Sequence, residues 1–271
     1  MPISHRHLAA GLLAGASLLT AGSVANARDP KPDAVLELRQ YTLHPGKRDT
    51  LIDIFERNFV EGQEAQGMTI VGQFRDLDSP DRFVWLRTFP DMAARARALN
   101  GFYFGPVWQA NRNGANPTMV DSDNVLLLKP ALPRSALAPS REARPEPTAK
   151  GSGPGLVVAQ IVYLRTAADP AFLAFFDNEL RPLLAAAGAP VLGAYVTETA
   201  ANNFPQIPVR NTEPVFVWFM SFPDGTAYER HRMALRQSQT WRAATGRLSL
   251  WSYQPIETLR LQPTARSRLH G

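Results

Sequence analysis

The side chains most able to do chemistry lie on two segments that are predicted to be neighbouring strands. Glu37, Arg39 and Tyr41 alternate along the first segment, and Trp85 and Arg87 alternate along the second. Side chains two positions apart on a strand point to the same face. Two guanidinium groups on one face can bind the oxygens of a carboxylate, an enolate or a carbonyl. We therefore predict that Arg39 and Arg87 stabilise negative charge and that Tyr41 acts as an acid.

Four further side chains are predicted to bind a ligand beside these catalytic candidates. They are Glu37, Gln73, Trp85 and Trp218. We expect the alternate residues Leu36, Leu38, Val84 and Leu86 to face the helices, which directs the polar set, Arg75 included, into the space between two sheets. One half of that pocket is polar and the other apolar, which suits an amphipathic ligand. Two alternatives stay open: a buried set of paired charges, and tryptophans that only fill the core.

The strands that position these residues belong to a unit that occurs twice. Residues 83–91 (FVWLRTFPD) recur as residues 216–224 (FVWFMSFPD), an offset of 133 positions. Gly67, Gly72 and Phe74 match Gly188, Gly193 and Tyr195 at an offset of 121. The difference, 133 − 121 = 12, indicates an insertion in the second copy, within the Asn- and Pro-rich residues 197–214. This insertion could cover the mouth of a barrel or contact a partner.

Each copy shows the same order of predicted elements. In the first copy a strand at 35–42 precedes an amphipathic helix that ends near Gly67, then strands follow at 68–75 and 82–89. Asp91 and Asp224 are predicted N-caps of second helices, and Asp169 with Pro170 begins the helix of the second copy. A last strand, at 120–129 or 252–261, closes each unit. The order β-α-β-β-α-β is that of the ferredoxin-like unit.

Two such units are expected to fold together. A sheet that is apolar on both faces must be covered, so the copies most simply pack their free faces against each other. The predicted class is α+β, with two ferredoxin-like repeats forming a fused dimeric α/β barrel. The repeats are expected at residues 28–130 and 155–263, with a proline-rich linker at 131–154 and a tail at 264–271. The alternative is two separately folded domains that swing on the linker.

The first 27 residues have the pattern of a signal peptide. His5, Arg6 and His7 precede an apolar stretch, and Ala25 and Ala27 place small residues where a signal peptidase cuts. Cleavage after Ala27 predicts a secreted or periplasmic protein, and an uncleaved anchor helix is the alternative. No later apolar run is long enough for a membrane span.

Composition restricts the remaining chemistry. The chain has 271 residues with 29 basic and 24 acidic side chains, and the scattered arginines argue against a nucleic-acid partner. The absence of cysteine excludes disulfides and thiolate sites. We predict no metal and no cofactor, because His44 and His231 have no carboxylate at a ligand-like spacing. His231 could be an axial haem ligand, but a surface helix position is favoured. Arg95 and Arg97 are expected on a solvated helix face.

The first copy resembles a known family. Residues 37–47 (ELRQYTLHPGK), the strand that contains Trp85 and the closing residues 124–130 (NVLLLKP) are similar to the NIPSNAP family. The second copy departs from it, because residues 157–163 (VVAQIVY) have neither the Glu nor the Arg. The resemblance implies a dimeric α/β barrel. Members have mostly been discussed as binding or signalling proteins, and the wider fold relatives include cofactor-independent monooxygenases, lyases, isomerases and haem-binding proteins.

These observations favour an exported, NIPSNAP-like protein that binds a small organic molecule in the barrel between its two sheets. Oligomers are possible, and turnover is left open. One alternative is a non-catalytic protein interaction module. The other is a cofactor-independent monooxygenase, lyase or isomerase.

Overall fold

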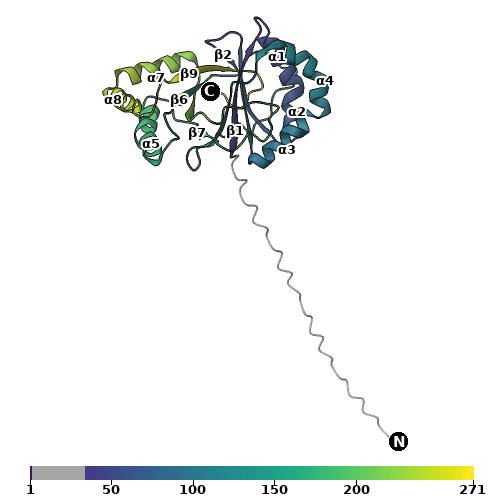
Figure 1. Ribbon diagram of the computed structural model, residues 1–271, viewed down its shortest axis with the longest axis horizontal. Coiled ribbons are helices and arrows are strands. Elements are labelled where there is room, and N and C mark those ends of the chain that lie inside the picture. The colour runs from purple at the N-terminus through teal and green to yellow at the C-terminus, as the bar shows by residue number, and fades with distance from the viewer. Residues whose placement is uncertain (2–33) are drawn as a thin grey trace. The chain divides into compact units, whose positions relative to one another are not determined.

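A closed barrel of eight antiparallel strands forms the centre of the protein (Figure 1). The computed structural model describes Met1 and residues 34–271, so the predicted signal peptide lies outside the described residues apart from its first residue. The barrel strands are β1 (Val35–Leu43), β2 (Thr69–Asp76), β3 (Arg82–Phe89), β5 (Val125–Pro130), β6 (Leu156–Tyr163), β7 (Gly193–Thr197), β8 (Val215–Phe222) and β9 (Glu257–Pro263).

The order of the strands confirms the predicted fused barrel. Around the barrel they run β1-β3-β2-β9-β6-β8-β7-β5, and β5 pairs with β1 again. Each half contributes four consecutive strands, and the halves join where β2 pairs with β9 and β5 pairs with β7. The two sheets therefore meet edge to edge through backbone hydrogen bonds. The alternative of two domains swinging on a linker is wrong.

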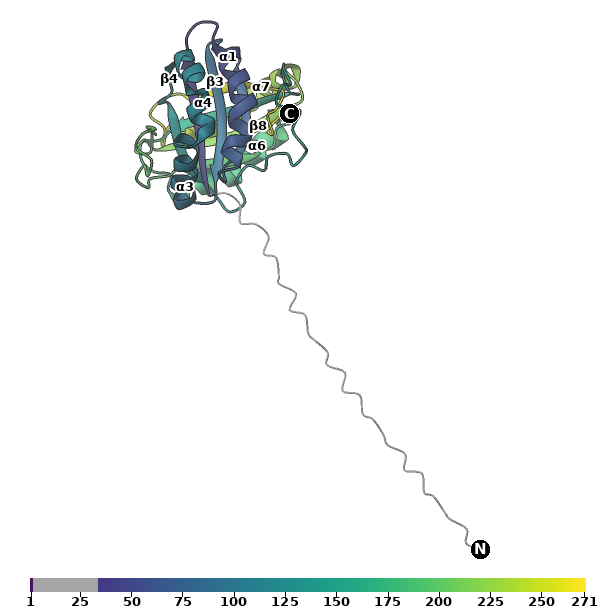
Figure 2. The same ribbon diagram turned by 90° about the vertical axis from the view of Figure 1, so that its right-hand side faces the viewer.

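Two groups of helices cover the barrel on opposite sides (Figure 1). The first half contributes α1 (Arg48–Ile54), the π-helical turn η1 (Phe55–Phe59), α2 (Val60–Glu64), α3 (Met92–Tyr103), α4 (Pro106–Ala115) and the 3-10 turn η2 (Asn116–Thr118). The second half contributes α5 (Pro170–Phe175), the π-helical turn η3 (Phe176–Leu180), α6 (Arg181–Ala186), α7 (Gly225–Gln237) and α8 (Gln239–Leu248). Figure 2 looks onto the first-half helices, with β3 visible between α1 and α4.

Most predicted element boundaries agree with the structure. The side chains of Asp91, Asp169 and Asp224 each accept a hydrogen bond from the backbone N–H three residues later, which confirms all three as N-caps. Gly67 and Gly188 both have positive φ, as helix C-caps require. The predicted strand at 120–129 is divided into a short β4 (Met119–Asp121) and β5.

Large apolar side chains from both halves fill the barrel interior. They include Leu36, Leu38, Val84, Leu86, Val157, Ala159, Ile161, Val217 and Phe219. The expected assignment of faces is therefore wrong, because Leu36 and its neighbours point inward whereas Trp85 and Tyr41 pack under the first-half helices. An eight-stranded barrel is just wide enough for side chains to fill, so its interior excludes unpaired charge. The side chains alternate between the two faces of each strand as predicted, but the face predicted to point toward the helices points into the barrel, and the other face points toward the helices.

The same exchange separates the two tryptophans of the repeat. Trp218 packs under the second-half helices, in a cluster distinct from that of Trp85. The barrel wall and its apolar interior lie between the two clusters. A pocket shared by Trp85 and Trp218 between the sheets is therefore excluded.

The linker and the tail both contact the first half of the chain. Arg144 of the linker donates hydrogen bonds to the Glu64 carboxylate at 2.7 Å and to the Ile70 carbonyl at 2.6 Å. Arg266 of the tail is 2% exposed and forms an ion pair with Glu61.

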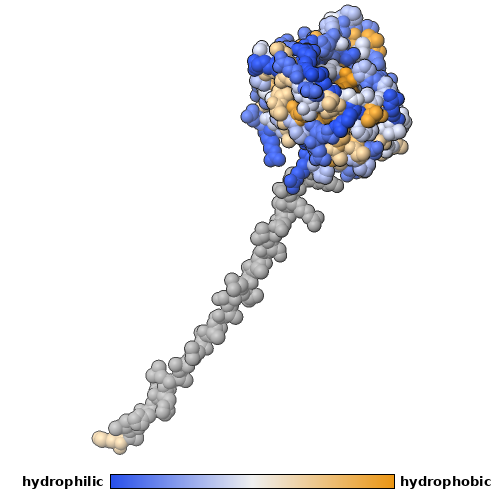
Figure 3. Space-filling model, turned by 90° about the vertical axis from the view of Figure 1, so that its left-hand side faces the viewer, coloured by the Kyte–Doolittle hydropathy of each residue, from blue (hydrophilic) through white to orange (hydrophobic). Residues whose placement is uncertain are grey.

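Among the described residues, every helix is too short or too polar to cross a bilayer. Apolar and hydrophilic residues are interspersed on the side of the second-half helices (Figure 3).

Candidate functional site

A buried carboxylate on β1 lies at the centre of a cluster of arginines. Glu37 Oε2 accepts hydrogen bonds from Arg39 Nη1 at 2.6 Å and Arg87 Nε at 2.7 Å, and its Oε1 accepts from Arg95 Nε at 2.7 Å. All four side chains are at most 1% exposed. The register of β1 and β3 sets Glu37 opposite Arg87, and α3 brings Arg95 over both strands.

The Glu37 carboxylate stays ionised at neutral pH. Burial opposes the charged form of Glu37, but the charges of Arg87, Arg39 and Arg95 outweigh burial and hold the pKa of this carboxyl well below its usual range. Burial also opposes the charge on Arg39, and its neighbours Tyr41 and Glu37 nevertheless raise the pKa of that guanidinium. The interpretation as a buried set of paired charges is therefore correct for these residues, although three cations face one anion.

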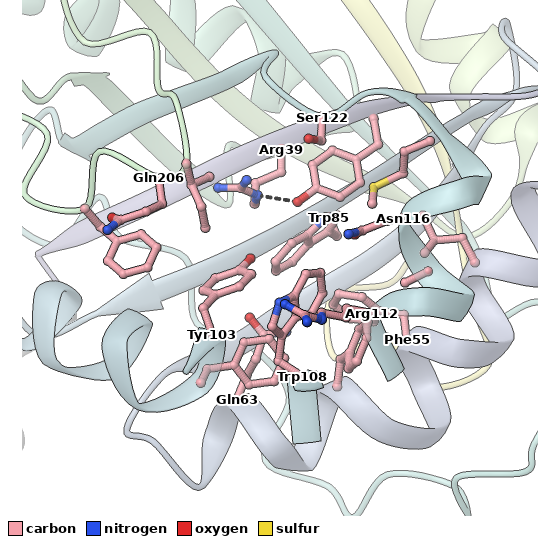
Figure 4. Close-up of a pocket in the computed structure, with 18 of the residues that line it drawn as sticks. Arg39, Phe55, Gln63, Trp85, Tyr103, Trp108, Arg112, Asn116, Ser122 and Gln206 are labelled. Carbon is pink, nitrogen blue, oxygen red and sulfur yellow. Dashed lines mark hydrogen bonds between the residues drawn. The ribbon is translucent and has the colours of Figure 1, made fainter. Parts of the chain in front are cut away.

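A cavity of about 330 Å³ adjoins the cluster, between the outer face of the first-half sheet and its helices (Figure 4). Arg39 and Tyr41 are two of its polar lining residues. Its walls are mostly aromatic, with side chains from β3, η1, α3 and α4: Trp85, Phe55, Phe59, Phe102, Tyr103 and Trp108. Arg112, Asp123 and Ser122 lie among the polar lining residues.

Tyr41 is arranged as a hydrogen-bond donor toward the cavity. Its hydroxyl oxygen accepts from Arg39 Nε at 2.9 Å, the contact marked by the dashed line in Figure 4. Because this lone pair is used by Arg39, the hydroxyl hydrogen is free to point elsewhere. Burial raises the pKa of Tyr41 above its usual range despite the charge of Arg39. Tyr41 is therefore a neutral phenol at physiological pH.

The second half supplies the roof of this first-half cavity. The loop from Glu198 to Pro214, which joins β7 and β8, is the predicted insertion, and Phe204, Gln206, Ile207 and Pro208 line the cavity from it. Phe204 is 2% exposed and stacks on Tyr103 with ring centroids 5.6 Å apart. Asn203 Nδ2 donates to the Met92 carbonyl at 2.5 Å. The insertion thus covers the outer side of the first-half sheet, not a barrel mouth.

Five of the predicted site residues come together, in two layers. Arg39, Tyr41 and Trp85 line the cavity. Glu37 and Arg87 are fully buried behind Arg39, where Arg87 Nη1 also donates to the Gln63 side-chain oxygen at 2.8 Å. Trp85 forms the floor, with its ring 4.7 Å from that of Phe55.

Two predicted ligand-binding residues lie elsewhere. The side-chain amide of Gln73 is buried without a hydrogen-bond partner in the described part of the chain, and it does not line the cavity. Trp218 lies in the second half. Its strand pairs as β3 does, so that Val158 and Met220 occupy the places of Glu37 and Arg87. The second copy therefore has no counterpart of the charged cluster.

Two sequence expectations about helices were wrong. Arg95 is fully buried, and only Arg97 of the pair is exposed. The spacing of Arg95 with Leu99 and Phe102 was the available signal, since it places all three on one helix face. His231 is 3% exposed, with Nδ1 3.1 Å from the Ala187 carbonyl oxygen. Within residues 34–271 no group of three or more His, Cys, Asp or Glu side chains could hold a metal ion.

The comparison with known families concerns the half that contains the site. The model of the NIPSNAP family matches residues 36–132. The first half of this chain belongs to the NIPSNAP family. The NIPSNAP half carries Glu37, its three arginine partners and the cavity walls, and the second half carries the roof. None of the curated proteins matches the chain.

Three solved structures match nearly the whole chain and show the same fold. A candidate monooxygenase from Lactobacillus acidophilus NCFM has 12% identity and a TM-score of 0.54, with 87% of this chain and 97% of that protein covered. A candidate monooxygenase from Fusobacterium nucleatum has 11% identity and a TM-score of 0.56, with 89% and 96% covered. An anthrone oxidase-like protein has 15% identity and a TM-score of 0.54, with 89% and 98% covered.

Proposed function

We propose that the NIPSNAP half binds a small planar organic molecule in its cavity, with the polar end of that molecule toward Arg39 and Tyr41. The observation that carries the proposal is the size and lining of the cavity: about 330 Å³, mostly aromatic walls, and the hydrogen-bonded pair Arg39 and Tyr41 among its polar residues. Small-molecule sites have this composition and start at about this size. The cavity lies between the sheet and its helices, which replaces our expectation of a site inside the barrel.

The test uses the two equivalent tryptophans as a matched pair. Trp85→Leu and Trp218→Leu each remove a buried indole at the same place of the repeat, so both should lose stability, by roughly 2–4 kcal/mol. Native mass spectrometry of protein purified from its host should detect a bound compound in the wild type and in Trp218→Leu. Trp85→Leu should lose it. Equal retention by both variants would place the ligand elsewhere.

A second candidate is cofactor-independent oxygenation in the same cavity. Two relatives of the same fold are candidate monooxygenases and a third is an anthrone oxidase-like protein, and here Arg39 and Tyr41 are donors placed to stabilise an oxyanion. A substrate that enters as its enolate could transfer electrons to O2 and form a carbon–oxygen bond. Protonation gives a hydroperoxide, and loss of water leaves a ketone, so that CH2 and O2 become C=O and H2O.

Anthrone serves as the probe for this second candidate. Oxygen uptake and anthrone loss should be equal in amount, and both should fall in Tyr41→Phe. Uptake no faster than in protein-free buffer would leave a binding protein without this turnover. A chain that binds no compound in either experiment would favour the alternative of a non-catalytic interaction module.

We further propose export, from residues 1–27 alone. N-terminal sequencing of the protein from its host should begin at Arg28. A first residue of Met1 would contradict cleavage.

A further inference from the structure

We propose that the molecule bound in the cavity is an anion whose charge is received by Arg39, an aromatic carboxylate or phenolate. This inference rests on the proposed function, because it names the class of ligand for the same cavity. It starts from a count of buried charges. Arg39, Arg87 and Arg95 carry three positive charges and Glu37 carries one negative charge, so the cluster has a net charge of 3 − 1 = +2 with every member at most 1% exposed.

The side chains that complete the cluster do not balance this charge. From α2, β1 and the loop, the remaining hydrogen-bond acceptors are neutral: Gln63 to Arg87, Tyr41 to Arg39, and Asn202 with Asn203 to Arg95. The two charged residues elsewhere in the cavity lining, Arg112 and Asp123, have opposite signs. Within the described residues, Glu37 is the only acidic side chain that forms an ion pair with the cluster.

A surplus of two buried charges is costly unless an anion is close. Neutral dipoles compensate a buried charge only in part, and buried ions usually occur with partners of opposite sign. An anion in the cavity would reduce the surplus to one. A neutral ligand of the same shape would leave the surplus charge unchanged. The cluster should therefore favour an anionic ligand over a neutral one.

Arg39 is the member of the cluster through which the ligand can be reached. It lines the cavity, whereas Glu37, Arg87 and Arg95 lie behind it. Its Nη1 donates to Glu37 and its Nε to Tyr41, while its Nη2 makes no hydrogen bond to any described residue. The free Nη2 and the Tyr41 hydroxyl are two donors that belong to the lining of a mostly aromatic cavity. This arrangement suits the oxygens of an aromatic carboxylate, or a phenolate oxygen.

The test compares two probes of nearly the same shape that differ by one charge, 2-naphthoate and 2-naphthamide. Affinities are measured by calorimetry at neutral pH, at low and at high salt. Because a hydrogen bond to a charged group is stronger than one to a neutral group, we expect the wild type to bind 2-naphthoate about 10- to 100-fold more tightly than 2-naphthamide. Because the charges are buried, this ratio should persist at high salt.

Variants locate the charge that selects the anion. Arg39→Met should bind 2-naphthoate and 2-naphthamide with about equal affinity. The variant should still fold, because Glu37 keeps its ion pairs with Arg87 and Arg95. Arg39→Lys keeps a charge without the planar fork and should give an intermediate preference. Gln160→Met, the equivalent position in the second half, is the matched control and should retain the full preference.

The outcomes separate the inference from the function on which it rests. Equal affinity of both probes in the wild type overturns the anion proposal and leaves the proposed function standing. A preference that survives in Arg39→Met, or that disappears at high salt, overturns the assignment to the buried cluster. If neither probe binds and the protein from its host carries no compound, the proposed function itself fails.

Discussion

Arg95 Nη1 donates to the side-chain oxygen of Asn203 at 2.8 Å, which joins two residues 108 positions apart in the chain. The same guanidinium donates from Nε to Glu37. Arg95 therefore links the charged cluster of the NIPSNAP half to the loop that the second half extends over the cavity. Duplication followed by insertion accounts for this arrangement, because one copy keeps the charges and the other supplies the cover.

Arg95→Met should loosen the loop from Glu198 to Pro214. The change removes the hydrogen bonds to Asn202 and Asn203 but leaves Glu37 with two arginines, so the fold should persist. We expect faster amide hydrogen exchange within the loop and about tenfold faster release of a bound probe, since each bond to a charged group contributes roughly 1.5–3 kcal/mol. Arg97→Met, exposed on the same helix, is the control. Unchanged exchange in Arg95→Met would contradict the link.

Glu37→Gln should destabilise the fold strongly. It leaves three buried guanidinium groups without a carboxylate, and breaking a buried pair in this way typically costs about 3–5 kcal/mol. The folded-state pKa of Glu37 lies well below its unfolded value near 4.5, so its contribution is complete above that pH and is lost as the pH falls toward the folded-state pKa. In urea unfolding, the difference in free energy of unfolding between the wild type and Glu37→Gln should become smaller below about pH 4.5. A difference that does not change with pH would contradict the low folded-state pKa of Glu37.

His231 should make the stability of the second half depend on pH. Burial lowers its pKa from the usual 6.5, so the unfolded chain binds a proton more readily than the folded chain. The contribution of the neutral imidazole is therefore complete above about pH 6.5 and decreases as the pH falls below it. Thermal unfolding of the wild type should show this decrease relative to His231→Phe. Parallel pH profiles for the two proteins would contradict it.

The sequence predicts the repeat, the order of the elements and the three aspartate caps, because these depend on local patterns and on one internal comparison. It does not assign the faces of β1 from that strand alone, since apolar side chains can pack on either face of a strand that is buried on both sides. Comparison of the copies carries the missing signal. The inward position Leu36 corresponds to Val157 and both are apolar, whereas Glu37 corresponds to Val158. The position that is charged in one copy and apolar in the other therefore marks the face of β1 that points away from the barrel interior.

Arg95 and the roof are harder to predict for a different reason. Nothing in residues 198–214 indicates that they cross to the other half, and that crossing depends on how the barrel closes. The buried arginine is visible only as a helix position in phase with Leu99 and Phe102. Contacts between distant segments are set by tertiary packing, which local periodicity does not encode.

Tyr41→Phe should weaken anion binding without removing it. The variant loses the hydroxyl donor toward the ligand and leaves Arg39 Nε without its acceptor, so we expect about 5- to 20-fold lower affinity for 2-naphthoate, together with a stability loss of roughly 1–3 kcal/mol. Tyr163→Phe is the matched control, because it removes a tyrosine hydroxyl that donates to Glu257 in the second half and should leave affinity intact. Since burial raises the pKa of Tyr41, wild-type affinity should stay constant up to about pH 9. A decline through neutral pH would mean that Tyr41 ionises there and repels the ligand.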